Sequence, residues 1–309
     1  MDRVLFRMKQ VDVFTDKPLE GNPLAVVFSA DRLNEATMQR IAREMNLSET
    51  TFILRPRDPR ADYRMRIFTP SREIPFAGHP SIGTAHALIE EQCIKLQGVE
   101  TTVYQEIAIG ILPLEIYTDA GKVERIMMTQ GRPTFGQQVE ETNWLADALG
   151  ITAEKINSTG LKPQVVSTGL DQLFIPIENL KTVRELKPNL TKIGEIESKL
   201  NVVGCFAFTL EAENKGNFVH GRMFAPNEGV TEDPATGSAA GALGAYLMNH
   251  GKLPIDDHAK FSIEQGHEIG RPSRIFVEVY HDRGVPTKIR VGGKAVTVLN
   301  GALELTKTS

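Results

Sequence analysis

The sequence has few cysteines, no run of basic residues and no long apolar stretch. Its two cysteines among 309 residues, Cys93 and Cys205, form no CxxC pair, so a reduced, cytoplasmic chain is the simplest prediction. The net charge of −4, without a Lys/Arg cluster, disfavours nucleic acid as a partner. No segment approaches the roughly 18 apolar residues of a membrane span, and the first residues lack the apolar core of a signal peptide. We therefore expect neither a nucleic-acid nor a membrane partner.

Several familiar site patterns are also missing. No G-x-G-x-x-G follows a predicted strand, which leaves dinucleotide binding unsupported. No His, Cys and Asp residues occur at the local spacing of a metal site. His79-Pro-Ser-Ile-Gly83 differs from the G-x-S-x-G turn of hydrolases because its first position is not glycine. The sequence thus gives no support to a metal site, a dinucleotide site or a hydrolase turn.

What the chain does contain is a duplication. Arg66-Ile-Phe-Thr-Pro70 is followed by the glycine turn Gly78-His-Pro-Ser-Ile-Gly83 and a helix pattern of small residues. Arg222-Met-Phe-Ala-Pro226 is followed by Gly237-Ser-Ala-Ala-Gly241 and a similar pattern, about half the chain length further on. Solenoid repeats run to only about 20 to 50 residues. The spacing therefore indicates two whole domains of one design.

Each glycine turn opens a helix, where free backbone N–H groups and the helix dipole favour an anion. Two such turns facing each other across a cleft would bind a small, negatively charged molecule. Around them the pattern predicts many strands and few helices, which favours two half-barrels, each around a helix, over a regularly alternating doubly wound sheet. The expected elements include helices over 34–47 and 190–200, a hairpin over 103–117, and a loop over 131–136.

Three ionisable residues are candidate catalytic groups. Glu49 lies where the first helix gives way to an apolar strand, and the matching stretch of the second half has no carboxylate. A carboxylate among apolar groups has a raised pKa suited to proton transfer, although a solvated acid at a strand start is the plainer interpretation. His79 lies in the first glycine turn, within expected reach of Glu49 or the bound molecule, or it caps the helix. Asp233 precedes the second turn, where a helix cap is the alternative.

Hydroxyl groups flank the second turn. Thr236 and Ser238 are candidates for substrate binding beside Gly237, and both are also suited to capping the helix. The polar segment around Gln265 and Gly266 could line the same cleft, but a loop and hairpin is the simpler prediction.

Taken together, these motifs resemble the PhzF-like family of phenazine-biosynthesis isomerase-like proteins. The resemblance covers nearly the whole chain and rests on the segments Val11-Asp-Val-Phe-Thr15, Gly21-Asn-Pro-Leu-Ala25, Ser48-Glu-Thr50, Phe68-Thr-Pro70, Ala77-Gly-His-Pro80, Arg222-Met-Phe-Ala-Pro226 and Glu232-Asp-Pro-Ala-Thr-Gly-Ser238.

The resemblance implies an α+β fold of two pseudo-symmetric, diaminopimelate-epimerase-like domains, commonly in a homodimer and without a cofactor. The first domain would comprise residues 1–117 with a C-terminal strand at about 296–309, and the second residues 118–295. The family's catalytic glutamate corresponds to Glu49, and its accessory groups to His79 and Asp233. Its substrate-carboxylate contacts correspond to the backbone around Gly78 and Gly237, with Ser238.

One departure from the wider superfamily bears on mechanism. Epimerases and racemases of this fold carry a thiol before the glycine of each turn, whereas this chain has Ala77 and Thr236. Two-thiol racemisation is therefore excluded, and a single-carboxylate isomerase acting on a small carboxylate is expected. The alternatives are a non-catalytic protein that binds a carboxylate metabolite, and a hydrolase with Ser81 or Ser238 as nucleophile.

Overall fold

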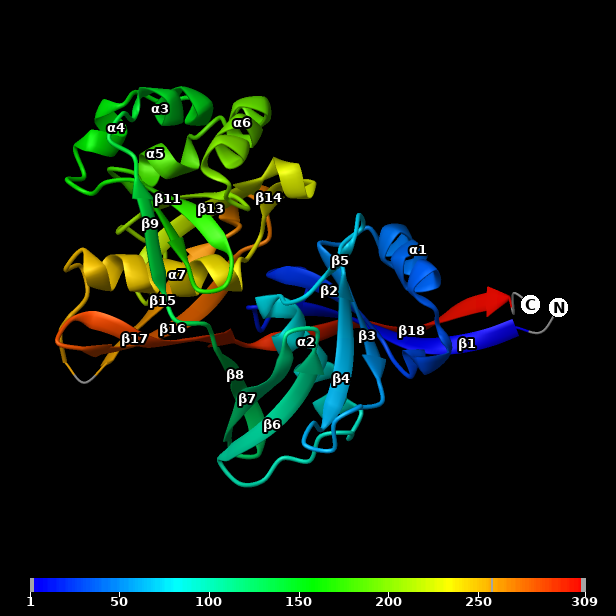
Figure 1. Ribbon diagram of the computed structural model, residues 1–309. Coiled ribbons are helices and arrows are strands. Elements are labelled where there is room, and N and C mark those ends of the chain that lie inside the picture. Colours follow the sequence, from blue (N-terminus) through cyan, green and yellow to red (C-terminus); the bar gives the residue numbers. More distant parts are fainter. Residues whose placement is uncertain (1–2, 257, 307–309) are drawn as a thin grey trace. The chain divides into compact units, whose positions relative to one another are not determined.

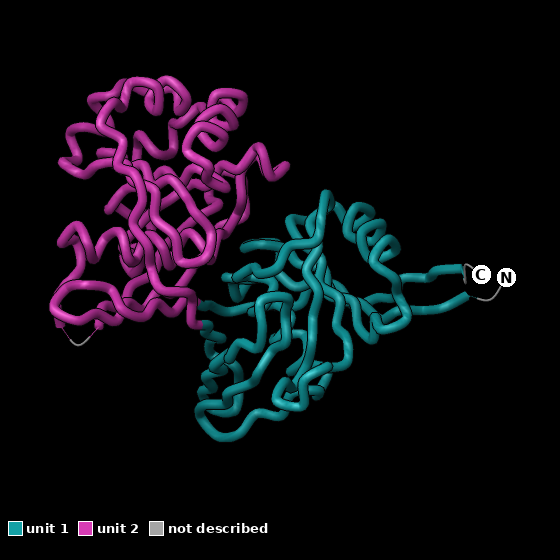
Figure 2. The backbone as a smooth tube through the Cα atoms, viewed as in Figure 1, with its two compact units in different colours: residues 1–128, 292–309 teal, residues 129–291 magenta. Residues whose placement is uncertain are grey.

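The computed structural model describes residues 3–256 and 258–306 and contains two compact units. One unit runs through Met128 and resumes at Gly292, and the other comprises Thr129–Val291 (Figure 2). The first division lies one strand later than the expected boundary after residue 117, because strand β8 (Lys122–Thr129) pairs antiparallel with β7 (Gly110–Asp119). The return to the first unit lies before β18 (Ala295–Thr306), which pairs along β1 (Arg3–Val13).

The first unit is a mixed sheet around one buried helix (Figure 1). Strand pairs β1–β2, β3–β4, β4–β5 and β6–β7 are antiparallel, whereas β2–β3 and β4–β6 are parallel. The remaining elements of this unit are β2 (Asn22–Val27), η1 (Ala30–Arg32), α1 (Glu35–Met45), β3 (Glu49–Leu54), β4 (Tyr63–Phe68), β5 (Glu73–Ile74), α2 (Gly78–Glu90) and β6 (Glu100–Ile107).

The second unit repeats this topology pair by pair. Strand pairs β10–β11, β12–β13, β13–β14 and β15–β16 are antiparallel, and β11–β12 and β13–β15 are parallel. Its elements are β9 (Thr134–Gln138), α3 (Asn143–Leu149), α4 (Glu154–Asn157), β10 (Gln164–Ser167), β11 (Asp171–Pro176), α5 (Leu180–Arg184), α6 (Leu190–Leu200), β12 (Cys205–Thr209), β13 (Val219–Ala225), η2 (Pro226–Glu228), β14 (Val230–Asp233), α7 (Gly237–Asn249), β15 (His258–Gln265), η3 (His267–Ile269), β16 (Ser273–Asp282) and β17 (Val285–Gly293). The duplication predicted from the sequence is thus a duplication of fold.

The central helices α2 and α7 are buried on nearly every side, which their small, apolar residues allow. Close packing fixes some of these residues as glycine. A Cβ added at Gly83 would lie 2.7 Å from Leu24 Cδ2 and 2.8 Å from Val13 Cγ2. Each glycine turn consequently begins a helix whose body is locked in the core.

The equivalent helices of the two units, α1 and α6, begin and end in the same way. Asn34 accepts a hydrogen bond from the Thr37 N–H at 2.9 Å, as expected for an N-cap, and Asn189 caps α6 in the same way from Lys192. Both helices end at an asparagine in the left-handed region, Asn46 with φ 50° and Asn201 with φ 52°. The predicted helix over 190–200 is confirmed residue by residue.

One expectation for the second unit was wrong, and three short helices were missed. Residues 131–136 are not all loop, because β9 begins at Thr134 and pairs with β10. The short helices α3, α4 and α5 were not predicted, since four to seven residues give too few turns for an apolar period to show. They bury Leu145, Ile156 and Val183 in the core of this unit. No helix in the described part of the chain is long and apolar enough to cross a membrane.

Candidate functional site

Glu49 is the first residue of β3, and three residues separate it from the end of α1 at Met45. Its backbone is in register with Leu24 of β2, and the next two residues, Thr50 and Thr51, are fully buried. The Glu49 side chain is 17% exposed. The strand therefore fixes this carboxylate at the edge of the core rather than in bulk solvent.

His79 is the second residue of α2 and lies against Glu49. Its Nε2 is 3.2 Å from Glu49 Oε2, and its side chain is 6% exposed. Burial lowers the pKa of His79 to about 3, so the imidazole is neutral near pH 7. The expectation that the ring reaches Glu49 is confirmed as geometry. A carboxylate beside a neutral imidazole is a pair that can hold or pass a single proton.

The N-terminus of α2 adjoins this pair. The residue before the helix, Ala77, is extended with φ −155° and ψ 150° and offers no side-chain cap, and the first turn carries no acidic residue. The N–H groups of the first turn and the positive end of the dipole therefore remain suited to an anion. The first unit thus places the Glu49–His79 pair beside the N-terminus of α2, a helix end suited to an anion.

In the second unit, Asp233 and Thr236 lie together before α7. The Thr236 Oγ1 donates a short hydrogen bond to Asp233 Oδ2, and Gly237 begins the helix directly after. Thr236 makes no side-chain cap to α7, so its hydroxyl serves Asp233 instead. The expected Asp233 and Thr236 positions are thus linked to each other.

Gln265, the last residue of β15, binds the turn that contains Asp233 and Thr236. It was not predicted as a site residue. Its side chain is fully buried, its Oε1 accepts from the Thr236 N–H at 3.0 Å, and its Nε2 donates to the Asp233 carbonyl at 2.6 Å and to Thr236 Oγ1 at 3.0 Å. The polar segment around Gln265 was visible in the sequence. That this residue ends a strand and turns into the core was not.

Two further buried amides support the N-terminus of α7. Gln172 donates from Nε2 to Ser238 Oγ at 2.9 Å. Gln130 donates from Nε2 to the Gly237 carbonyl at 2.9 Å and accepts from Thr168 Oγ1 at 2.7 Å. Isolated glutamines carry no sequence signal for such a role.

The two serines proposed as nucleophiles have partners that are not bases. Ser81 is fully buried and donates to the Ala77 carbonyl at 3.1 Å. Ser238 accepts from the Gln172 amide. Activation of a serine requires a base within hydrogen-bond reach. These contacts disfavour the hydrolase alternative.

Glu49 has no acidic counterpart in the other half of the chain. Thr50 pairs with Phe68 and Cys205 with Phe224, which makes Gly204 the counterpart of Glu49. A Cβ at Gly204 would lie 2.2 Å from Met223 Cε and 2.9 Å from the Phe224 carbonyl oxygen. Packing therefore excludes a carboxylate there, and the asymmetry noted in the sequence has a steric basis.

Asp233 is likewise unmatched in the other unit. It pairs with Met223 on β13, whereas the equivalent pair in the first unit is Ile67 with Ile74. The first unit thus has an acid at the start of β3 and Ile74 at the position of Asp233, whereas the second unit has Gly204 and Asp233 at these two positions.

The chain is similar to known proteins over nearly its whole length. The model of the family described as phenazine biosynthesis-like protein, PhzC-PhzF, matches residues 11–301. The chain is 37% identical over 303 residues to trans-2,3-dihydro-3-hydroxyanthranilate isomerase of Pseudomonas fluorescens, covering 96% of this chain and 98% of that protein.

Solved structures agree in fold. A PhzF-family phenazine biosynthesis protein of Bacillus anthracis superposes with a TM-score of 0.88 at 32% identity, covering 98% of this chain and 99% of that one. A hydroxyproline epimerase from Agrobacterium vitis superposes with a TM-score of 0.67 at 16% identity, over 97% of this chain and 93% of that one, and shows the fold alone. The predicted epimerase-like α+β fold is confirmed.

Proposed function

Because the chain belongs to the phenazine biosynthesis-like (PhzF) family and is an isomerase of that family, we propose that it shifts a proton between two carbons of a small carboxylate substrate. The observation that carries this proposal is the contact between Glu49 and His79, 3.2 Å apart, beside the N-terminus of α2. The isomerase class follows from the family. The route through Glu49 is our inference from the geometry.

In the proposed reaction the Glu49 carboxylate removes a proton from a carbon that is alpha or vinylogous to the substrate carboxylate. The electron pair of the broken C–H bond delocalises into the carboxylate, where helix N–H groups stabilise the added negative charge. Protonated Glu49 then delivers its proton to another carbon, and the double bond shifts. The Glu49 carboxylate is regenerated, so no oxidant, reductant or co-reactant is consumed.

His79 positions Glu49 in this scheme. Because burial holds the pKa of His79 at about 3, the ring is a neutral partner that does not permanently neutralise the base. A permanent cation at the same distance would lower the pKa of the Glu49 carboxyl and weaken it as a base. A neutral imidazole orients the carboxylate without lowering its pKa in this way.

The second unit supplies substrate contacts in our proposal. The backbone N–H groups around Gly237, with Ser238 and Thr236, would bind polar groups of the substrate, as would the backbone of Gly78 in the first unit. Asp233, which lies before the second glycine turn, would accept or relay a proton of the substrate. Gln265 holds Asp233 and Thr236 in place for this task.

The cysteines give no support to a thiol mechanism. Cys205 lies fully buried in β12, and Cys93 is exposed beyond the end of α2. Burial raises the pKa of the Cys205 thiol well above its usual range, which disfavours the thiolate. A carboxylate base is the better fit to these residues.

The relative from Pseudomonas fluorescens suggests a first substrate. Its name states that it isomerises trans-2,3-dihydro-3-hydroxyanthranilate, an unsaturated carboxylate of the class proposed here. We propose this compound and related small unsaturated or amino-acid-like carboxylates as the substrates to examine.

The test is NMR of the protein incubated in D₂O with a panel of these carboxylates. Isomerisation appears as new carbon-bound proton signals, and exchange appears as deuterium at carbon. Glu49→Gln should abolish both while leaving substrate binding in place, because the amide keeps the shape and loses the base. Glu44→Gln, an exposed change near the end of α1, is the matched control and should behave as wild type.

Two outcomes would contradict the proposal. Turnover that survives in Glu49→Gln would remove this residue from the chemistry. Binding of a carboxylate by both proteins, with neither turnover nor exchange in the wild type, would favour the non-catalytic binding protein.

A further inference from the structure

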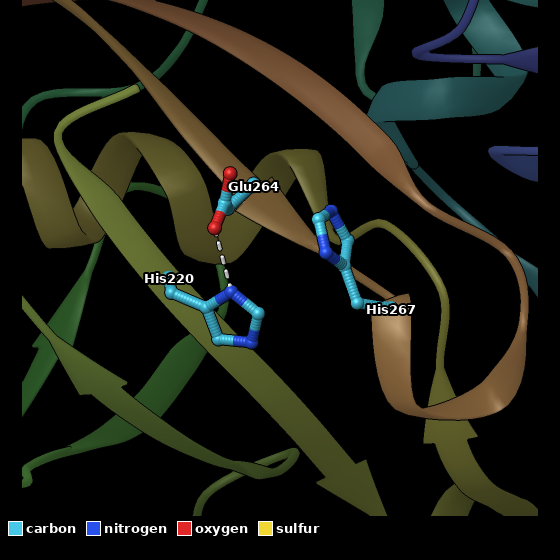
Figure 3. Close-up of side chains that lie close together, drawn as sticks. All are labelled: His220, Glu264 and His267. Atoms are coloured by element: carbon cyan, nitrogen blue, oxygen red, sulfur yellow. Dashed lines mark hydrogen bonds and ion pairs between the residues drawn. The ribbon is translucent and has the colours of Figure 1, made fainter. Parts of the chain in front are cut away.

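A cluster of histidine and glutamate side chains lies in the second unit, apart from the residues assigned to proton transfer. His220 comes from β13, Glu264 from β15 and His267 from η3 (Figure 3). One ligand atom from each of these three side chains lies within 4.8 Å of the other two. His220 and Glu264 are fully buried, and the His267 side chain is 15% exposed. From this convergence we propose that His220, Glu264 and His267 bind a divalent transition-metal cation of the zinc type.

The donor set fits such a cation. Two imidazoles and one carboxylate leave one tetrahedral position for water, as in many open zinc sites. Nδ1 of His220 lies 2.8 Å from Oε1 of Glu264. Ligands about 2.0–2.1 Å from a tetrahedral metal are separated by about 3.3 Å. To bind one ion, His220 Nδ1 and Glu264 Oε1 would move apart by about half an ångström, and the His267 ring would move toward them.

Each histidine is also oriented by a carboxylate outside the proposed ligand set. Nε2 of His220 lies 2.8 Å from Glu268 Oε1, and Nδ1 of His267 lies 2.9 Å from Glu213 Oε2. Metal-binding histidines commonly donate their second ring N–H to a carboxylate, which fixes the tautomer and the ring orientation. For His220 this contact leaves Nδ1, the nitrogen that faces Glu264, as the ligand atom.

Glu264 is held by the chain around it. Its Oε2 accepts from the Asn217 amide at 2.8 Å and from the Asn214 N–H at 3.1 Å. A fully buried carboxylate requires compensating positive charge or hydrogen bonds. The nearby Arg222 is paired with Glu232 at 2.8 Å and lies 4.0 Å from Glu268, so its charge is already shared.

Comparison with the first unit shows that the carboxylate at the position of Glu264 is balanced by a positive charge. In the first unit the residues in the registers of His220 and Glu264 are Arg64 and Glu106. Arg64 Nε lies 3.5 Å from Glu106 Oε1, and Glu106 accepts backbone hydrogen bonds from its own β3–β4 loop, as Glu264 does from the β12–β13 loop. The first unit thus places a permanent cation opposite the loop-holding carboxylate. The second unit has an imidazole there, which leaves the positive charge to a metal ion or to a proton.

Equilibrium dialysis distinguishes these two occupants. Tag-free protein is treated with a chelator and then dialysed against Zn²⁺ or Co²⁺. We expect one metal per chain with a dissociation constant of about 1 µM or tighter, intense visible absorption of the Co²⁺ form, and a rise in Tm on adding Zn²⁺.

Two variants test the ligands. His267→Gln changes a partly exposed residue and should weaken binding by about 10-fold or more. His220→Arg copies the first unit, should fold because Arg64 occupies the equivalent position, and should abolish binding. His281→Gln, a histidine on β16 outside the cluster, is the matched control and should bind metal as the wild type does.

The proposal is overturned if the wild type binds less than one equivalent under these conditions, because a proton on His220 then supplies the charge. It is equally overturned if His220→Arg, shown to be folded by the fluorescence of Trp144, binds as tightly as the wild type. None of these readouts depends on isomerase turnover.

Discussion

Glu197 offers the sharpest test of how burial and charge set the stability of the second unit. This residue of α6 is 2% exposed, its Oε2 accepts from the Asn227 N–H at 3.0 Å, and its Oε1 has no hydrogen-bond partner among the described residues. Burial raises the pKa of the Glu197 carboxyl to about 7 from the usual 4.5. The nearby Glu228 acts in the same direction.

The sign of the effect follows from proton binding. Between pH 4.5 and 7 the folded state keeps the Glu197 proton and the unfolded state releases it, so stability falls as pH rises through this window. Above pH 7 both states are ionised and the cost is constant. The full shift corresponds to about 3 kcal/mol at most. Glu197 lines a surface cavity of about 430 Å³ with Ser198 and Asn227, and water there reduces the expected cost to about 2 kcal/mol.

Glu197→Gln keeps an acceptor for Asn227 and removes the charge. We expect the variant to match the wild type at pH 4.5 and to exceed it by about 2 kcal/mol in free energy of unfolding at pH 8. Urea unfolding followed by the fluorescence of Trp144 measures this directly. Trp144 is the single tryptophan and packs against the core of the second unit, so it reports on the unit that contains Glu197.

The matched control is Glu195→Gln, an exposed change on the same helix, which should shift stability little at either pH. A stability gain in Glu197→Gln of the same size at pH 4.5 and pH 8 would refute the reasoning, because it would not come from ionisation. No gain at pH 8 would show that the folded protein does not destabilise the Glu197 carboxylate.

Two further changes test the support of the second glycine turn. Gln265→Leu removes three hydrogen bonds to Asp233 and Thr236. We expect a loss of about 2–4 kcal/mol in free energy of unfolding, measured by urea titration, and reduced isomerisation, measured by NMR. Full stability with full turnover would contradict the proposed support of the turn by Gln265. Gly241→Ala would place a Cβ 1.8 Å from Gln130 Oε1 and displace the amide that bonds to Gly237. We expect this variant to lose about 1–3 kcal/mol in free energy of unfolding. An unchanged Tm would show that the Gln130 amide is not fixed against Gly237.

The parts of the fold that the sequence predicted are those with a local or repeated signal. The helices predicted over 34–47 and 190–200 each begin after an asparagine cap, Asn34 and Asn189, that bonds to a backbone N–H three residues further on, so this signal lies in neighbouring positions. The duplicated Arg-x-Phe-x-Pro and glycine turns made the two halves visible because both copies keep the same packing. Arg66 pairs with Glu73, and Arg222 pairs with Glu232, in equivalent places.

The parts that could not be predicted depend on contacts between distant segments. Gln265 acts on residues about 30 positions earlier, and nothing in its local sequence distinguishes it from a surface glutamine. The same holds for His220 and Glu264, which lie in parallel register on β13 and β15 but far apart along the chain. A metal pattern read from local spacing cannot detect ligands that a sheet brings together.

Of the candidate site, Glu49 and His79 were placed together correctly because the strand after α1 and the first glycine turn were both recognised. The Asp233 and Thr236 candidates were also found to lie together, although the hydrogen bond between them was not anticipated. Their roles in catalysis stay predictions.

The packing around Gly204 has a consequence for how this enzyme can change. A duplicated gene starts with two equivalent halves, and a second acid at the counterpart of Glu49 would be the direct route to a two-base enzyme. Any side chain at Gly204 meets Met223 Cε at 2.2 Å and the Phe224 carbonyl at 2.9 Å. A shift of the flexible Met223 side chain relieves the first contact, but the second contact is with the backbone and requires movement of β13. A side chain at Gly204 thus carries a cost in backbone rearrangement that Glu49 does not carry, and the two halves are sterically unequal at this position.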